Sequence, residues 1–240
     1  MTPRANNSSA GLPIDWFLMV ALLAVVGLYV RAMGFTPPDA FQGLAQKILY
    51  IHPPAAVAAY LAFGVCALMS VLFLWLHDER SDVAAAAAGE VAVLFFSVVL
   101  VTGPLWGRKI WGAWWTWDAR LTMSLFLWFI GIGYLVVRHT FDEESLRARY
   151  SAVLAILAVI LIPFVHLSVY FFRTLHPMPV MLAPQLGGGD DPSLSPEMRR
   201  TAGLAFLTFV LLCVAFIRAR YRLGALRAEL AMAEEAAERR

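Results

Sequence analysis

Apolar residues gather in six long runs along the chain, separated by short stretches that carry most of the charges. Each run approaches the ~20 residues that span a bilayer as a helix. Lipid excludes open sheet edges, so the pattern predicts helices rather than strands. We therefore expect an all-α integral membrane protein with six transmembrane helices. The runs cover residues 16–33, 54–76, 83–103, 121–137, 152–172 and 201–217.

Prolines mark several of the expected helix ends. The pair at Pro53 and Pro54 suits the start of the second helix, where a missing N–H costs nothing. Thr102-Gly103-Pro104 is expected to end the third helix, and Pro163 to kink the fifth. We expect two parts in the chain: a six-helix membrane domain over residues 1–220 and a polar, helical cytoplasmic tail over residues 221–240.

Composition supports the membrane interpretation. The 240 residues are 60% hydrophobic and 15% charged, with a mean hydropathy of +0.69, against about 45–50% and about 25% in soluble domains. Residues 6–9 are polar and no small-residue cleavage site follows the first run, so we expect a retained helix and not a signal peptide. The net charge of +2, without a basic stripe, argues against a nucleic-acid partner.

Six spans would put both termini on one side of the membrane and the first, third and fifth loops on the other. Eleven basic residues fall on the terminal side and eight on the opposite side. The positive-inside rule then predicts cytoplasmic termini and three outward loops. The last of these, residues 174–200, is rich in Pro, Gly and Ser, which favours an irregular segment suited to a lid or a docking surface.

The third loop contains the most unusual stretch of the chain, WGRKIWGAWWTWDAR at residues 106–120. Tryptophan offers a flat apolar face and one N–H donor, so a cluster of them suits a planar, hydrophobic ligand. An aromatic belt is the alternative, but a belt scatters its residues over several helix ends. We expect a ligand platform at the membrane surface. It comprises Trp106, Trp111, Trp114, Trp115, Trp117 and Asp118.

Two histidines fall on the same membrane face as these tryptophans. His52 precedes the second helix and His176 follows the fifth. Neutral imidazole is a preferred ligand of haem iron, and two facing rings could occupy both axial positions. His166, inside the fifth run, could be a buried hydrogen-bonded residue or a further ligand. Glu90 is an intramembrane acid and so a functional candidate, although it lies close enough to the surface to snorkel.

Other functions fit these residues less well. A solute transporter would need polar or broken helices near the midplane, and a membrane oxidoreductase would need histidines buried on facing helices. A purely structural subunit would leave the tryptophan cluster without a role. Cys66 and Cys213 form neither a C-x-x-C pair nor a C-x-x-C-H motif, which argues against thiol redox chemistry and covalent haem attachment to this chain.

The segment WGRKIWGAWWTWDARLT resembles the WWD motif of haem-handling membrane proteins in cytochrome c biogenesis. The chain length and six spans make it similar to the haem exporter protein C (CcmC) family. Phe171 and Phe172 stand where that family usually has a Trp pair, Pro177 replaces a Gln and Pro53 a Val. The resemblance extends from the first helix to the sixth.

That resemblance implies a fold in which periplasmic loops form a haem platform on the bacterial inner membrane. It implies haem b, with His52 and His176 as the axial ligands of its iron. It further implies a non-enzymatic protein that passes haem to the periplasmic chaperone CcmE, beside CcmD and the CcmAB transporter. The alternative within the same resemblance is a transporter subunit for solute or haem in an ABC-type export complex.

Haem carries two propionates, which need partners near lipid. Arginine binds a carboxylate in a bidentate fork, and Arg120 follows Asp118 within the motif, so Arg120 is the first candidate. Lys47, five residues before His52, is a looser one, as are Arg108, Lys109 and Arg173. Arg120 could instead anchor the fourth helix or pair with Asp118.

Overall fold

The computed structural model describes residues 15–177 and 194–239. Within these residues it contains six helices long and apolar enough to cross a membrane and no β-strand, so the predicted all-α membrane fold is confirmed. The expectations for residues 6–9 and for most of the 174–200 loop lie outside the described residues.

Six α-helices and two short helical segments make up the described chain. The 3-10 segment η2 leads directly into α2, and the π-helical segment η1 extends α1. The elements are α1 (Trp16–Val30), η1 (Arg31–Phe35), η2 (Leu44–Tyr50), α2 (His52–Leu76), α3 (Glu79–Ile110), α4 (Ala119–Thr140), α5 (Glu144–Phe171) and α6 (Pro196–Glu238).

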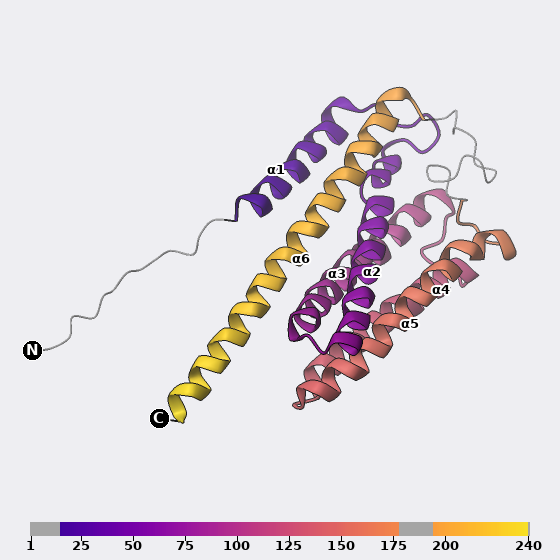
Figure 1. The fold of residues 1–240 in the computed structure, drawn as a ribbon. Coiled ribbons are helices and arrows are strands. Elements are labelled where there is room, and N and C mark those ends of the chain that lie inside the picture. Colours follow the sequence, from indigo (N-terminus) through magenta and orange to yellow (C-terminus); the bar gives the residue numbers. More distant parts are fainter. Residues whose placement is uncertain (1–14, 178–193, 240) are drawn as a thin grey trace, which may run out of the picture.

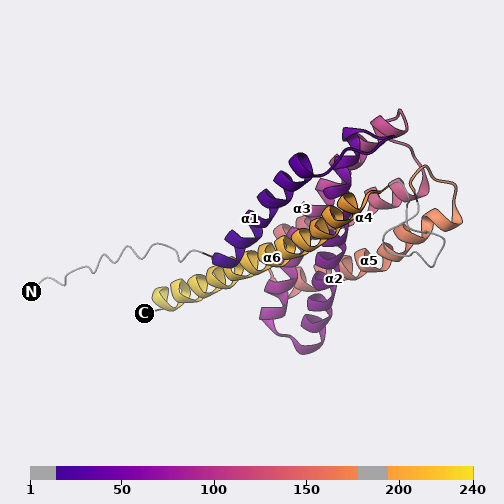
Figure 2. The same ribbon diagram turned by 90° about the horizontal axis from the view of Figure 1, so that it is seen from above.

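The helices form a bundle around α2 (Figure 1). Helix α2 packs against α3, α5 and α6, while α4 packs on α5 and α1 runs along α6. Figure 2, turned by 90°, again shows α1 beside α6. Because successive helices alternate in direction, the connections α1–α2 and α3–α4, the end of α5 and the start of α6 lie at one end of the bundle. The first and third loops therefore lie together, as expected, while most of the fifth lies outside the described residues.

Small residues allow the helices to approach closely. Ala55, Ala58, Ala59 and Ala62 follow helical spacing on α2 and are all 0% exposed. Interfaces in membranes favour such residues, since packing rather than hydrophobic exclusion holds helices together in lipid. Large apolar side chains instead cover the outside of the bundle, which is the surface expected to face lipid.

The prediction that Thr102-Gly103-Pro104 ends the third helix is wrong. Helix α3 continues through Pro104 to Ile110, and the first tryptophan of the cluster, Trp106, lies on it. A proline removes one backbone hydrogen bond, and neighbouring helices compensate for that loss within a membrane protein. Helix α5 likewise continues through Pro163.

Helix α6 runs without a break from the membrane segment into the polar tail and ends at Glu238. The tail is therefore helical as expected, but it is the continuation of α6. In Figure 1 this end of α6 projects beyond the other helices. The division of the chain at residue 220 stays a prediction. Near this point Arg220 donates to Glu90, with 2.7 Å between Nη2 and Oε1, so the intramembrane acid has a partner on α6.

Candidate functional site

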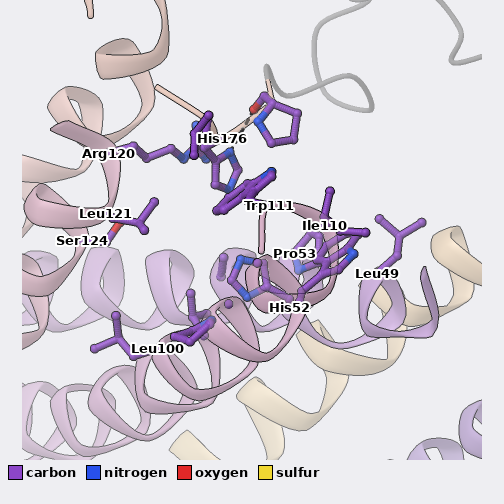
Figure 3. Close-up of a pocket in the computed structure, with 18 of the residues that line it drawn as sticks. Leu49, His52, Pro53, Leu100, Ile110, Trp111, Arg120, Leu121, Ser124 and His176 are labelled. Atoms are coloured by element: carbon purple, nitrogen blue, oxygen red, sulfur yellow. Dashed lines mark hydrogen bonds between the residues drawn. The ribbon is translucent and has the colours of Figure 1, made fainter. Parts of the chain in front are cut away.

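A cavity of about 450 Å³ opens at the end of the bundle where the first and third loops meet the end of α5 and the start of α6 (Figure 3). This volume lies within the range of pockets that bind small molecules and cofactors. Seven of the ten residues predicted for the site line the cavity. They are His52, Trp106, Trp111, Trp114, Trp115, Arg120 and His176. Lys47, Trp117 and Asp118 are not part of its lining among the described residues.

His52 is the first residue of α2, where the two following prolines favour a helix start. Its ring packs against the last turns of α3. The Nδ1 atom lies 3.0 Å from the hydroxyl oxygen of Thr102, and the ring meets Trp106 edge-on, with 6.1 Å between centroids. A Cβ added to Gly103 would lie 3.1 Å from His52 Cε1, so the ring rests directly on the α3 backbone.

His176 enters the cavity from the segment that follows α5. Its Nδ1 lies 2.9 Å from the carbonyl oxygen of Pro177, which can only accept, so Nδ1 carries the proton. The ring meets Trp111 edge-on at 6.3 Å between centroids. Burial, and next the nearby positive charge of Arg120, lower the pKa of His176 from 6.5 to about 3. The ring is therefore neutral at physiological pH, the form that ligates metals.

The tryptophan segment is half helix and half loop. Trp106 lies on α3 and donates its indole N–H to Gln42 Oε1 over 2.9 Å, which ties α3 to the first loop. Trp111 caps α3, and Gly112 then reverses the chain with a φ of +76°, a conformation that favours glycine. The tryptophans beyond this turn differ in environment. Trp115 faces the cavity, whereas Trp117 is 76% exposed.

Asp118 organises the end of this loop. Its carboxylate accepts from the backbone N–H of Leu121 over 3.1 Å and from the hydroxyl of Thr116 over 3.0 Å. An aspartate at this position satisfies a free N–H at the start of α4 and suits the positive end of the helix dipole. The structure thus gives Asp118 a capping role, which positions the residues that follow it on α4.

Arg120 projects from the first turn of α4 toward the cavity, and Figure 3 shows its side chain extending toward His176. Its Nη1 is buried and has no hydrogen-bond partner within the described part of the chain. The alternative of an ion pair with Asp118 is not seen among the residues that the structure describes. Arg120 is therefore a cation whose donors are available to a ligand.

Lys47 binds backbone carbonyls at the end of the first membrane helix. Its ammonium donates to the carbonyl oxygens of Ala32, over 2.7 Å, and of Thr36. These carbonyls lie at the end of the first membrane-spanning segment, where the helix leaves acceptors unpaired. A lysine there also suits the negative end of the helix dipole. The role of Lys47 at the ligand site stays a prediction.

Sequence reasoning missed several cavity residues that come from apolar runs or from the first loop. Gln46 is 2% exposed and donates to the hydroxyl of Tyr50 over 3.0 Å. Tyr60 lines the cavity beside His166, which the sequence left open between a buried hydrogen-bonded residue and a further ligand, and the two ring centroids are 5.1 Å apart. Only an interruption of an apolar run by a polar side chain could have indicated these positions, and many such residues have purely structural roles.

Three buried polar atoms lack a hydrogen-bond partner and belong to residues of this one cavity. They are Gln46 Oε1, Trp115 Nε1 and Arg120 Nη1, judged over residues 15–177 and 194–239. Native proteins pair nearly all buried polar groups, so such a cluster is typical of a ligand-binding site. The rest of the lining is apolar and aromatic. A planar, largely apolar molecule that carries carboxylates, and that accepts imidazole ligands, fits this chemistry.

Comparison with known proteins assigns the chain to a family. The family model described as "Heme exporter protein C" matches residues 2–236. The chain belongs to that family. The protein of this name from Escherichia coli K12 is 30% identical over 209 residues, covering 87% of this chain and 82% of the relative. The one from Bradyrhizobium diazoefficiens is 38% identical over 202 residues, covering 82% and 74%.

A relative from outside the bacteria is also similar to this chain. A putative cytochrome c biosynthesis ccmC-like mitochondrial protein of Marchantia polymorpha is 36% identical over 161 residues, or 67% of this chain and 65% of the relative. Family membership supports a role in haem handling for cytochrome c biogenesis. The six membrane-spanning helices make the protein a multi-pass membrane protein.

Proposed function

We propose that this protein binds haem b at the periplasmic face of the bacterial inner membrane and delivers it to the haem chaperone CcmE. Its termini would then lie in the cytoplasm and its cavity would open toward the periplasm. Haem is the cargo in this proposal, and the protein is a binding and transfer component rather than an enzyme.

The two cavity histidines are the observation that carries the proposal. His52 from α2 and His176 from the segment after α5 line the same cavity. Each ring has Nδ1 engaged, with Thr102 and with Pro177 respectively. Their Nε2 atoms make no hydrogen bond to the described residues. Histidines that ligate metals hold one ring nitrogen in a hydrogen bond and offer the other, which is the arrangement seen here.

The remaining lining suits the body and the charges of haem. Trp106 and Trp111 place aromatic edges beside the two histidines, and an apolar wall would receive the porphyrin. Arg120 would bind a propionate, because its buried Nη1 has no hydrogen-bond partner within the described residues. The indole N–H of Trp115 is a second unpaired donor in the same lining.

Delivery requires a surface that another protein can reach. Trp114 is 58% exposed and Trp117 is 76% exposed, although both belong to the loop that borders the cavity. Exposed tryptophans are favoured anchors of protein interfaces. We infer that this loop contacts CcmE, and that the protein works beside CcmD and the CcmAB transporter in a haem export complex.

The experiment is a haem titration of the purified protein in detergent, followed by its Soret absorbance. His52→Ala and His176→Ala should each weaken haem binding, and added imidazole should restore part of the wild-type spectrum. His139→Ala is the matched control, because this exposed histidine lies near the far end of α4, with Nδ1 2.7 Å from the Leu135 carbonyl oxygen. Full haem occupancy with an unchanged Soret band in both variants would reject the ligand assignment.

A further inference from the structure

Three residues of α3 form a socket for the His52 ring: Thr102, Gly103 and Trp106. Thr102 contacts Nδ1 at 3.0 Å, Gly103 gives the ring room against the helix backbone, and Trp106 meets it edge-on. The first two are consecutive, and Trp106 follows one turn later on the same face of α3. The socket exists because α3 continues through Pro104 instead of ending there.

The hydroxyl of Thr102 has only one proton to give. It lies 2.7 Å from the carbonyl oxygen of Val98, four residues earlier on the same helix. A carbonyl can only accept, so the Thr102 proton points to Val98. With its proton on that bond, the Thr102 oxygen has only lone pairs for His52, so the contact at 3.0 Å is then a hydrogen bond donated by His52 Nδ1. The chain of bonds runs from His52 to Thr102 to Val98.

We propose that Thr102 is a positioning residue that fixes His52 as its Nδ1–H tautomer, so that Nε2 presents a lone pair to the cavity. The inference rests on the proposed function for the identity of the ligand, haem iron. The tautomer itself is a property of the ligand-free protein, and we assign it from the hydrogen bonds of Thr102. Thr102 acts through His52 and makes no contact with iron.

The residue types suit this role. A threonine within a helix commonly bonds the carbonyl four residues back, which uses its proton and orients its oxygen. Serine could make the same pair of bonds, whereas valine keeps the shape of the side chain but lacks the oxygen. Gly103 complements Thr102, because a larger residue there would press on His52 Cε1 and turn the ring away from its acceptor.

The first test reads the tautomer without haem. Nitrogen-15 NMR of the full chain, labelled at histidine, distinguishes a protonated from an unprotonated ring nitrogen, and His52→Gln identifies the His52 signals. The wild-type ring should show a protonated Nδ1 and an unprotonated Nε2. Thr102→Val should shift His52 toward the other tautomer or a mixture, and Thr102→Ser should retain the wild-type pattern. An unchanged tautomer in a folded Thr102→Val protein would overturn the proposal.

The second test measures haem affinity in the same variants. Loss of a hydrogen bond behind a metal-ligating histidine typically weakens binding by about 10- to 100-fold, so we expect a loss of about 10-fold in Thr102→Val and less than threefold in Thr102→Ser. Thr140→Val is the matched control. Thr140 makes the same bond to the carbonyl four residues back, over 2.8 Å, near the far end of α4 and is exposed.

The two tests separate this inference from the proposed function. If the wild-type protein bound no haem, the proposed function would fail, while the NMR result would still decide the tautomer. If Thr102→Val changed the tautomer but bound haem as tightly as wild type, Thr102 would not position the ligand. Equal losses in Thr102→Val and Thr140→Val would also overturn the proposal, because they would indicate a general effect on the helices.

Discussion

Asp82 and Arg138 are joined by two hydrogen bonds, with 2.6 Å between Nη1 and Oδ1 and 2.8 Å between Nη2 and Oδ2. The pair links the start of α3 to the end of α4, far along both helices from the cavity. The side chains of Arg138 and Asp82 are 11% and 14% exposed. A bidentate pair with so little access to water leaves an uncompensated charge when one partner is removed.

We therefore expect Asp82→Asn to lower the free energy of unfolding by about 3 kcal/mol. Glu144→Gln is the control, because Glu144 pairs with Arg147 at 3.2 Å on an exposed surface. Exposed pairs of this spacing contribute about 0.5 kcal/mol or less. Denaturant unfolding in detergent, followed by tryptophan fluorescence, measures both. Similar values for the two variants would contradict a special contribution from the buried pair.

The propionate role of Arg120 predicts a change in ligand preference. Wild-type protein should bind haem about tenfold more tightly than its dimethyl ester, since a hydrogen bond to a charged group contributes about 1.5–3 kcal/mol. Arg120→Ala should lose most of this preference. Arg173→Ala is the control, since Arg173 is an exposed arginine of the same end of the bundle. The two ligands are compared by titration of the Soret absorbance.

A variant Arg120→Ala that still distinguished haem from its ester as strongly as wild type would remove Arg120 from the propionate site. Transfer of the effect to Arg173→Ala would place the propionates at the rim of the cavity instead.

The tryptophan loop should support delivery through more than one side chain. Aromatic contacts contribute roughly 0.5–1.5 kcal/mol each beyond burial, so we expect the double variant Trp114→Ala, Trp115→Ala to lower transfer to CcmE more than either single change. Trp75→Ala is the control, because Trp75 is 78% exposed near the end of α2 that lies away from the cavity. Haem transferred to purified CcmE is the quantity to measure, and normal transfer by the double variant would contradict the prediction.

The sequence predicted the fold because lipid allows few alternatives. An apolar run of membrane length must become a helix, and alternation of six helices places three loops at one end. The same reasoning places His52, His176 and the tryptophans at one membrane face. Seven of the predicted residues line the cavity for this reason.

The finer geometry depends on contacts between distant residues, which periodicity does not contain. Trp106 bonds Gln42, 64 positions away, and Lys47 binds carbonyls of the first membrane helix instead of facing the cavity. The continuation of α3 through Pro104 depends on surrounding helices, which a local reading of Thr-Gly-Pro omits. The contact of His52 with Thr102 depends on this continuation of α3 and so could not be predicted from the local sequence.

The lowered pKa of His176 predicts how stability depends on pH. In the unfolded chain this ring takes up a proton near pH 6.5, whereas the folded protein does so only near pH 3. Between these values the unfolded state holds the additional proton, so the stability of the ligand-free protein decreases as the pH falls from 6.5 toward 3. Above pH 6.5 this contribution to the pH dependence disappears.

His176→Gln should therefore flatten the decline of the unfolding free energy between pH 6.5 and 5. His139→Gln, which changes an exposed histidine, should leave the decline as steep as in wild type. Denaturant unfolding of the haem-free protein at several pH values measures the slopes. Parallel curves for wild type and His176→Gln would show that burial of this ring does not oppose its protonation.

Gly103 provides a test in which haem affinity should fall without a loss of helix stability. Gly103 lies inside α3 with an ordinary helical backbone, where alanine is favoured over glycine by about 1 kcal/mol, and the following Pro104, which disfavours the helical conformation of a residue with a Cβ, offsets part of that gain. Its added Cβ would lie 3.1 Å from His52 Cε1, closer than carbon atoms normally approach. The ring must then shift away from the added Cβ, which strains its contact with Thr102, and we expect Gly103→Ala to bind haem about tenfold more weakly while unfolding at an equal or higher denaturant concentration. Gly203→Ala is the control, because no atom of the described residues beyond the local helix lies within 4 Å of the Cβ position on that helical glycine. Unchanged haem affinity in Gly103→Ala would show that the site tolerates a displaced His52. A loss of affinity together with a lower unfolding midpoint would mean that the substitution disturbs α3 as a whole.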